Sequence, residues 1–269
     1  MSQSARRRAN RASQTGGVMI GSCVRDIDPS FHTSLVSLLM YDHYNGGHIL
    51  EHGDVMELQS GPRIAAARNI VVDGFLDHPK KPEWLLMLDT DMVFPPNVLN
   101  DMLEVANPIT TPILGGLCFI GGRGAKVEPT IKICISKDPL EFETVWNYPL
   151  DSLVSCDATG AACLLVHRSV YEAVGTKFED TGFPYYAEGS SQEGANIGED
   201  VMFCMRARSL GFPIHVHTGI QFGHMKRGAY LDHEAYMQYR RGITADENGE
   251  EGYTEKYLAR RFIQGAKAV

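Results

Sequence analysis

Two aspartates, Asp89 and Asp91, stand one residue apart at the end of the apolar run of residues 84–88. Side chains two positions apart in an extended segment point to the same side, so both carboxylates can converge on one point. Carboxylates at that separation repel each other, and a hard divalent cation with open positions for phosphate oxygens removes the repulsion. The pair therefore indicates Mn²⁺ or Mg²⁺ that holds a phosphate group. The alternative is ordinary turn chemistry before a helix that begins at two prolines.

A second acidic pair, Glu199 and Asp200, falls in the first turn of a predicted helix. Carboxylates are favourable there because of the helix dipole, so a purely structural charge pair is the alternative to a catalytic role. Three histidines, His215, His217 and His224, follow that helix. No cysteine or carboxylate stands at a suitable short spacing for a zinc cluster, and His215 and His217 are predicted to be half-exposed strand residues.

These residues need a scaffold that brings them together. Short apolar runs alternate with segments of helical periodicity across residues 17–106, and this gives three strand–helix units. Such a succession predicts a parallel, doubly wound sheet, in which ligands bind at the carboxyl ends of the strands, where Asp89 and Asp91 lie. From about residue 112 the runs become rich in β-forming residues, which predicts antiparallel additions over one edge of that sheet.

Composition bounds the function. The chain has 269 residues, 43% of them hydrophobic, and a net charge of −8, which disfavours a polyanionic partner such as nucleic acid. No stretch approaches the roughly 18 apolar residues of a membrane span, so a soluble, cytoplasmic protein is expected. Six cysteines without CxxC spacing fit a reducing compartment. Residues 1–16 carry four arginines and no apolar anchor, which predicts a solubilising tail, or alternatively a phosphate-contacting arm.

The ordered combination of motifs resembles nucleotide-sugar glycosyltransferases of the GT-A fold, near the family 2 type, including the compact soluble enzymes of bacteriophages and bacteria. The motifs are Arg68-Asn69 on a helix, the DTD pair, TGA at residues 159–161, Glu199-Asp200 on a helix that ends in LGF, and His224. The resemblance implies an α/β, Rossmann-like fold with a mostly parallel central sheet, flanking helices and a smaller antiparallel addition. It also implies a catalytic domain of residues 17–225, which lies between the basic tail of residues 1–16 and a predicted C-terminal helical extension of residues 226–269.

Roles for individual residues follow from the same resemblance. Asp200 matches the base of inverting members, and Glu199 beside it would orient the acceptor. The implied metal ligands are Asp89, Asp91 and His224, and the implied donor-binding residues are Ser22, Arg25, Arg68, Asn69, Asp89 and Gly160. Ser22 and Arg25 are expected in the loop after the first strand. The loop of residues 185–198 is interpreted as a mobile lid.

The implied activity is transfer of one sugar from a nucleoside-diphosphate sugar to an acceptor hydroxyl, with Mn²⁺ or Mg²⁺. A QxxRW segment, typical of polymerising members, is absent, which favours single-sugar transfer. Inverting and retaining stereochemistry both stay open, as does the acceptor: a virion protein, a glycan or a modified DNA base, in the host cytoplasm for a phage enzyme. Two alternatives are a haloacid-dehalogenase-type phosphatase, whose nucleophile strand LDTDMVF resembles, and an inactive nucleotide-sugar binding module.

Overall fold

A computed structural model describes most of the chain between residues 16 and 246. The predicted tail, apart from Gly16, and the last part of the predicted C-terminal extension lie outside the described residues. Residues 191–195 of the predicted lid lie outside them as well. The described ranges are 16–49, 53–61, 63–121, 126–137, 140–190, 196–226 and 229–246.

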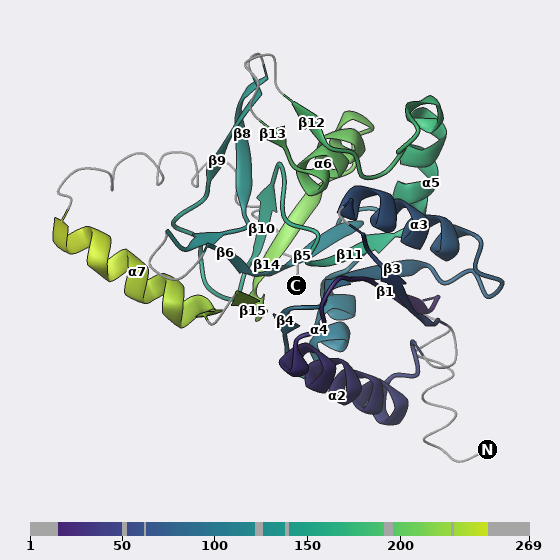
Figure 1. The fold of residues 1–269 in the computed structure, drawn as a ribbon, viewed down its shortest axis with the longest axis horizontal. Coiled ribbons are helices and arrows are strands. Elements are labelled where there is room, and N and C mark those ends of the chain that lie inside the picture. Colours follow the sequence, from purple (N-terminus) through teal and green to yellow (C-terminus); the bar gives the residue numbers. More distant parts are fainter. Residues whose placement is uncertain are drawn as a thin grey trace, which may run out of the picture.

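A seven-stranded sheet with the order β10-β14-β5-β11-β3-β1-β2 forms the centre of the molecule (Figure 1). Strand β1 is parallel to β2 and β3, and β5 is parallel to β14. Strand β11 runs antiparallel to both β3 and β5, and β10 runs antiparallel to β14, so five of the seven strands share one direction. The predicted mostly parallel α/β sheet is therefore confirmed. The bounds are β1 Val18–Val24, β2 Val55–Gln59, β3 Trp84–Asp89, β5 Ile113–Leu117, β10 Leu153–Cys156, β11 Cys163–His167 and β14 Ile214–Gln221.

Helices cover both faces of this sheet. Helices α2 and α4 lie on one face, and α3, α5 and α6 lie on the other (Figure 1). Strand β3 serves both cores, because Leu86 and Leu88 pack under α2 and α4 while Leu85 and Met87 pack under α3. A strand that is buried on both faces has a continuous apolar sequence, which explains the apolar residues 84–88 before Asp89. The bounds are α2 Pro29–Asn45, α3 Ile64–Leu76, α4 Val98–Val105, α5 Arg168–Lys177 and α6 Glu199–Ser209.

Helix α3 packs closely against strand β1 at Gly21. A Cβ atom at Gly21 would lie 2.3 Å from Cγ1 of Val71 on α3 and 3.3 Å from Cδ1 of Leu85 on β3. Such distances leave no room for a side chain, so glycine at this position lets the helix approach the sheet. The close approach matters for the site because α3 carries Arg68 and Asn69.

Small antiparallel sheets complete the fold around the carboxyl end of the central sheet. The three-stranded sheet β16-β15-β4 joins the residues after β3 to the residues after β14. Strand β5 lies inside the central sheet rather than over its edge, while the β8–β9 hairpin is a separate addition of the predicted kind. The predicted domain boundary after residue 225 falls inside β15. The bounds are β4 Met92–Val93, β6 Phe119–Ile120, β7 Glu128–Pro129, β8 Lys132–Lys137, β9 Leu140–Thr144, β12 Gly189–Ser190, β13 Asn196–Ile197, β15 Gly223–Lys226 and β16 Ala229–Leu231, with the 3-10 helix Glu179–Thr181 and helix α7 His233–Asp246.

The six cysteines are all free thiols, five of them buried and Cys134 half-buried. The five buried cysteines act as small apolar side chains in the two cores rather than as disulfide partners. Among the described residues, each helix is too short or too polar to cross a lipid bilayer.

Candidate functional site

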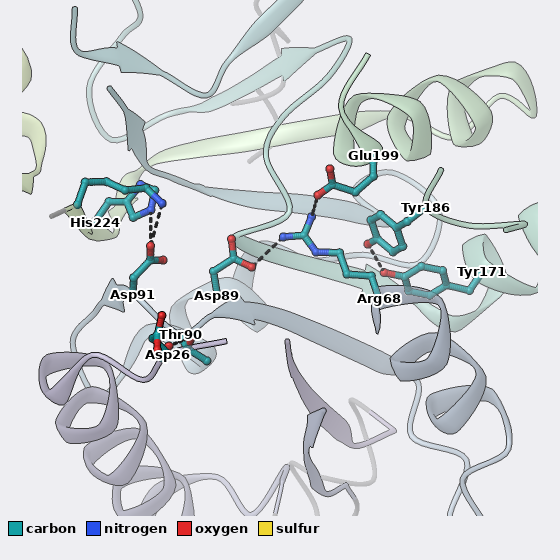
Figure 2. A network of polar contacts seen from close by, with 10 residues as sticks. Asp26, Arg68, Asp89, Thr90, Asp91, Tyr171, Tyr186, Glu199 and His224 are labelled. Carbon is teal, nitrogen blue, oxygen red and sulfur yellow. Dashed lines mark hydrogen bonds and ion pairs between the residues drawn. The ribbon is translucent and has the colours of Figure 1, made fainter. Parts of the chain in front are cut away.

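The DTD segment leaves strand β3 as a tight turn that is held from two sides. Asp89 is the last residue of β3, and Thr90 and Asp91 form the turn. The Thr90 hydroxyl donates to the carbonyl of Asp26 (2.6 Å), and the amide of Met225 on β15 donates to the carbonyl of Asp91 (2.8 Å). The loop after β1 and strand β15 thereby fix the turn, and each carboxylate binds a different set of partners (Figure 2).

Asp91 contacts two basic side chains from β15. Its Oδ2 lies 3.2 Å from Nε2 of His224 and 2.8 Å from Nζ of Lys226. Nδ1 of His224 lies 2.8 Å from the carbonyl oxygen of Phe119, and because a carbonyl only accepts, Nδ1 carries the proton and Nε2 faces Asp91. Burial alone would raise the pKa of Asp91, but His224 and Lys226 outweigh it and lower that pKa to about 2. Burial disfavours a charged imidazole, yet the hydrogen bond to Asp91 raises the pKa of His224.

Asp89 belongs to a second group, centred on the buried guanidinium of Arg68. Nη2 of Arg68 donates to Oδ1 of Asp89 (2.8 Å), and Nη1 donates to Oε1 of Glu199 (2.5 Å), so one side chain joins β3 to the start of α6 (Figure 2). The guanidinium also lies over the ring of Tyr186, 5.6 Å from its centroid. Burial opposes the charge of Arg68, but the carboxylates of Asp89 and Glu199 raise its pKa, so the side chain stays a cation.

Asp200 follows Glu199 in the first turn of α6 and lies beside the loop that contains Gly160. Its Oδ1 accepts from the amide of Val201 (2.7 Å). A Cβ atom at Gly160 would lie 3.7 Å from Oδ2 of Asp200, at ordinary van der Waals distance, so this glycine lies directly beside the carboxylate. Burial raises the pKa of Asp200, and the charge of Arg68 only partly offsets this. A carboxyl group with a raised pKa, one oxygen fixed and the other beside a glycine is suited to accept a proton.

The fit of the site to a divalent metal rests on Asp91 and His224. A carboxylate oxygen and an imidazole nitrogen are both ligands that Mn²⁺ binds. Histidines that bind a metal usually donate their other ring N–H to a carbonyl or carboxylate, and His224 donates to the Phe119 carbonyl in this way. The ammonium group of Lys226 contacts Asp91 and so occupies the position in which a metal ion would neutralise this carboxylate. In the described part of the chain, no group of three or more His, Cys, Asp and Glu side chains is placed to hold a metal ion. Asp91 and His224 are in contact, whereas Asp89 contacts Arg68 instead. A metal site formed by Asp89, Asp91 and His224 stays a prediction.

The two carboxylates have different partners because the chain turns at Thr90 and Asp91 and does not stay extended. Their convergence on one metal ion stays a prediction. Alternate residues share a side only while the backbone stays extended. Asp89 therefore faces Arg68, and Asp91 faces His224.

Of three predicted donor-binding residues, Ser22 and Asn69 differ from the expectation and Arg25 does not. Ser22 lies within β1 rather than in the following loop, and it is fully buried with no hydrogen-bond partner for Oγ among the described residues. Asn69 accepts from the amide of Tyr185 (3.1 Å) and donates to the carbonyl of Tyr186 (2.7 Å), so it anchors that segment. Arg25 is exposed in the loop after β1, as predicted.

The start of the predicted lid and one predicted strand histidine are buried. Tyr185 and Tyr186 are 6% and 0% exposed, so these first residues of the segment 185–198 belong to the core instead of a mobile lid. His215 is 1% exposed and not half-exposed, because helix α4 contacts strand β14 on that face. Neither ring nitrogen of His215 has a hydrogen-bond partner within the described residues. His217 is half-buried, as predicted.

Sequence reasoning missed three residues of the site: Lys226, Phe119 and Tyr186. The signal for Lys226 is its position two residues after His224 on one strand, which places both side chains on the same side. The signal for Tyr186 is an aromatic ring in the segment that leads to Glu199 and Asp200. Phe119 acts through its backbone carbonyl, for which side-chain patterns carry no signal.

The protein is similar to known proteins in its fold and not in its sequence. The sequence matches no protein-family model and no curated protein sequence. Among solved structures, A197 from STIV is similar with a TM-score of 0.52 and 13% identity, over 80% of this chain and 88% of that one. GalNAc-T7, crystallised with UDP, GalNAc and Mn²⁺, is similar with a TM-score of 0.53 and 11% identity, over 80% of this chain and 45% of that one. With these neighbours and the arrangement of its central sheet, the chain has a GT-A-like glycosyltransferase fold.

Proposed function

We propose that this protein is a metal-dependent glycosyltransferase that moves one sugar from a nucleoside-diphosphate sugar to an acceptor hydroxyl. The observation that carries the proposal is the polar site at the carboxyl end of β3. Asp91 and His224 form a cation-binding pair there, Arg68 joins Asp89 to Glu199, and Asp200 follows at the start of α6. A glycosyltransferase fold with these groups at this edge supports a transferase over other uses of the fold.

The donor half of the site would be formed by the residues around the DTD turn. Asp91 and His224 are the proposed protein ligands of Mn²⁺ or Mg²⁺, and a bound ion would neutralise the diphosphate leaving group as a Lewis acid. Asp89 is proposed to act through Arg68, which it holds in place. The presence of UDP, GalNAc and Mn²⁺ in the GalNAc-T7 structure supports a nucleotide-sugar donor and a divalent ion here.

Asp200 is proposed as the base. As the bond between the anomeric carbon and the donor phosphate oxygen breaks, the acceptor oxygen bonds to that carbon and its proton passes to the Asp200 carboxylate. Such a base contributes about 10²- to 10⁴-fold in rate. Glu199 is bound by Arg68, so we assign it a positioning role beside the base.

The acceptor would be a glycan, a virion protein or a modified DNA base. The formal charge of −8 counts against DNA, because contacts to a polyanion require a basic surface. Single-sugar transfer remains the proposed outcome.

A phosphatase of the haloacid-dehalogenase type is disfavoured by the contacts of Asp89. A nucleophilic carboxylate must reach phosphorus, whereas Oδ1 of Asp89 accepts from the buried Arg68. The fold is also that of GT-A glycosyltransferases. An inactive binding module differs from an enzyme only in turnover.

A donor screen tests the proposal. The protein is incubated with UDP-, GDP- and dTDP-sugars in Mn²⁺, and release of nucleoside diphosphate is measured with and without EDTA. We expect slow, Mn²⁺-dependent release from at least one donor, with loss of release in Asp91→Ala. Binding of a donor with no release in wild type would favour the inactive module, and release of inorganic phosphate would favour a phosphatase.

A further inference from the structure

A cavity lies between helix α7 and the segment of residues 146–150, next to the candidate site. Its volume is about 390 Å³, which is within the range of roughly 300–1,000 Å³ for small-molecule sites. No motif of the sequence points to this cavity, and no step of the proposed mechanism uses it. Residues that line it include Trp146, Tyr148, His233, Tyr236, Arg240 and Arg241.

The wall of the cavity is a group of nearly parallel aromatic rings around Tyr236. The ring of Tyr236 stacks on Tyr148 (centroids 5.8 Å apart, planes at 24°) and on Trp146 (6.4 Å, 15°). It also stacks on Phe119 (5.3 Å, 24°). Layered rings fix the orientation of the wall, and an aromatic face with polar groups at its edge suits a ligand that has both apolar and polar sides. A sugar ring has this character, because its C–H face is apolar and its rim carries hydroxyl groups.

Two arginines, Arg240 and Arg241, are among the residues that line the cavity. Nη2 of Arg240 donates to Oδ1 of Asn147 (2.9 Å), and its guanidinium lies over Trp146. Guanidinium groups recognise carboxylates and phosphates with matched, planar hydrogen bonds. The lining therefore favours a ligand that carries an anionic group.

Phe119 connects this cavity to the candidate site. Its carbonyl oxygen orients His224, and its ring stacks on Tyr236 of the cavity wall. Two exposed apolar side chains, Leu150 (64% exposed) and Met237 (37%), also line the cavity and extend its apolar surface into solvent. A ligand in the cavity is thus a near neighbour of the reacting groups and is not itself at the reacting centre.

We propose that this cavity binds a sugar ring with an anionic group, as an outer part of a glycan acceptor. The identification of this ligand as part of an acceptor rests on the proposed function, whereas binding in the cavity does not depend on catalysis. Contacts to a remote part of a substrate supply binding energy that positions its reacting hydroxyl. A single-stranded nucleic acid is the less favoured ligand, because it needs a basic groove along its backbone in addition to stacking.

A glycan-array experiment with the full-length protein tests the proposal, in EDTA and without a sugar donor. The array carries neutral oligosaccharides and others with uronic acid, sialic acid or phosphorylated hexose, together with single-stranded oligonucleotides. We expect binding to acidic glycans and loss of that binding in Arg241→Glu, an exposed charge reversal on α7. Lys177→Glu is the matched control, an exposed reversal at the end of α5, and it should bind like wild type. Trp146→Leu should also lose binding, with its folding checked by thermal melting.

Three results would overturn the proposal: no binding to any acidic glycan, equal binding by Arg241→Glu, or binding to oligonucleotides alone. The proposed function fails separately. Asp200→Asn should keep glycan binding, since the array requires no turnover. Glycan binding without any donor turnover would leave a carbohydrate-binding cavity and remove the transferase, and donor turnover without glycan binding would do the reverse.

Discussion

Arg68 is the single residue that connects the DTD turn to the acidic pair of helix α6. It is 2% exposed and contacts Asp89 and Glu199, so its removal leaves two carboxylates without their shared cation. We predict that Arg68→Met lowers the free energy of unfolding by about 3 kcal/mol, as expected when one partner of a buried ion pair is removed. Urea unfolding at pH 7 measures this. Arg63→Met, an exposed arginine next to the same helix, is the control and should change stability by less than about 0.5 kcal/mol. Equal losses in both variants would refute the assigned role of Arg68.

Asp200 is the residue on which the chemistry depends. We predict that Asp200→Asn retains the wild-type affinity for a nucleoside diphosphate and reduces transfer by about 10²- to 10⁴-fold, because only proton abstraction is lost. Initial rates of transfer with a fixed donor and acceptor measure the loss. Transfer within a factor of two or so of wild type would exclude Asp200 as the base and indicate a retaining mechanism.

The pH profile gives a second readout of the same residue. Burial raises the pKa of Asp200, and the base must be deprotonated, so kcat/KM should rise with pH through that raised pKa. The acidic limb therefore lies at higher pH than it would for an ordinary aspartate. In Asp200→Asn the remaining activity should lack this limb.

At the scale of elements, the position of helix α3 depends on its close approach to β1 at Gly21. We predict that Gly21→Ala lowers stability by about 1–3 kcal/mol, as overpacking does, and also weakens nucleotide binding because α3 shifts with Arg68. Urea unfolding and nucleotide titration measure the two effects. Gly61→Ala is the control, since a Cβ there meets no atom of the described residues within 4 Å. Unchanged nucleotide affinity in Gly21→Ala would show that the site does not depend on this packing.

Local patterns predicted the first strands and helices, because periodicity and apolar runs are local properties. They did not place β11, which inserts antiparallel between β3 and β5, since strand pairing joins segments far apart in sequence. Adjacent residues show the same limit. Arg68 and Asn69 were both assigned to the donor, but neighbours on a helix point about 100° apart, and only Arg68 faces the site. The catalytic and metal residues remain predictions from resemblance and chemistry.

At the scale of the whole molecule, one buried histidine links stability to pH. Burial lowers the pKa of His215 to about 4, whereas an unfolded chain has a histidine pKa near 6.5. Between these values the unfolded state binds a proton that the folded state does not, so stability is lost as pH falls from 7 towards 4. We predict that His215 accounts for a loss of about 2 kcal/mol between pH 7 and pH 5.

The variant His215→Leu isolates this contribution. Its register partner Leu114 belongs to the apolar core under α2 and α4, where leucine fits the surroundings. Urea unfolding of both proteins at pH 7 and pH 5 gives the difference. If the stability of the wild type and of His215→Leu depended on pH in the same way, His215 would bind a proton equally well in the folded and unfolded states.

The central claim is that the DTD turn binds a nucleoside diphosphate through a divalent ion held by Asp91 and His224. Calorimetric titration of UDP, GDP and dTDP, in Mn²⁺ and then in EDTA, tests it most directly. We predict that one nucleotide binds in Mn²⁺ and at least about tenfold more weakly in EDTA, a difference of about 1.4 kcal/mol. Asp91→Ala should lose this metal dependence, while Asp54→Ala, an exposed aspartate outside the site, should keep it. Equal affinity in Mn²⁺ and EDTA, or full metal-linked binding by Asp91→Ala, would show that the DTD segment is only a turn at the end of a strand.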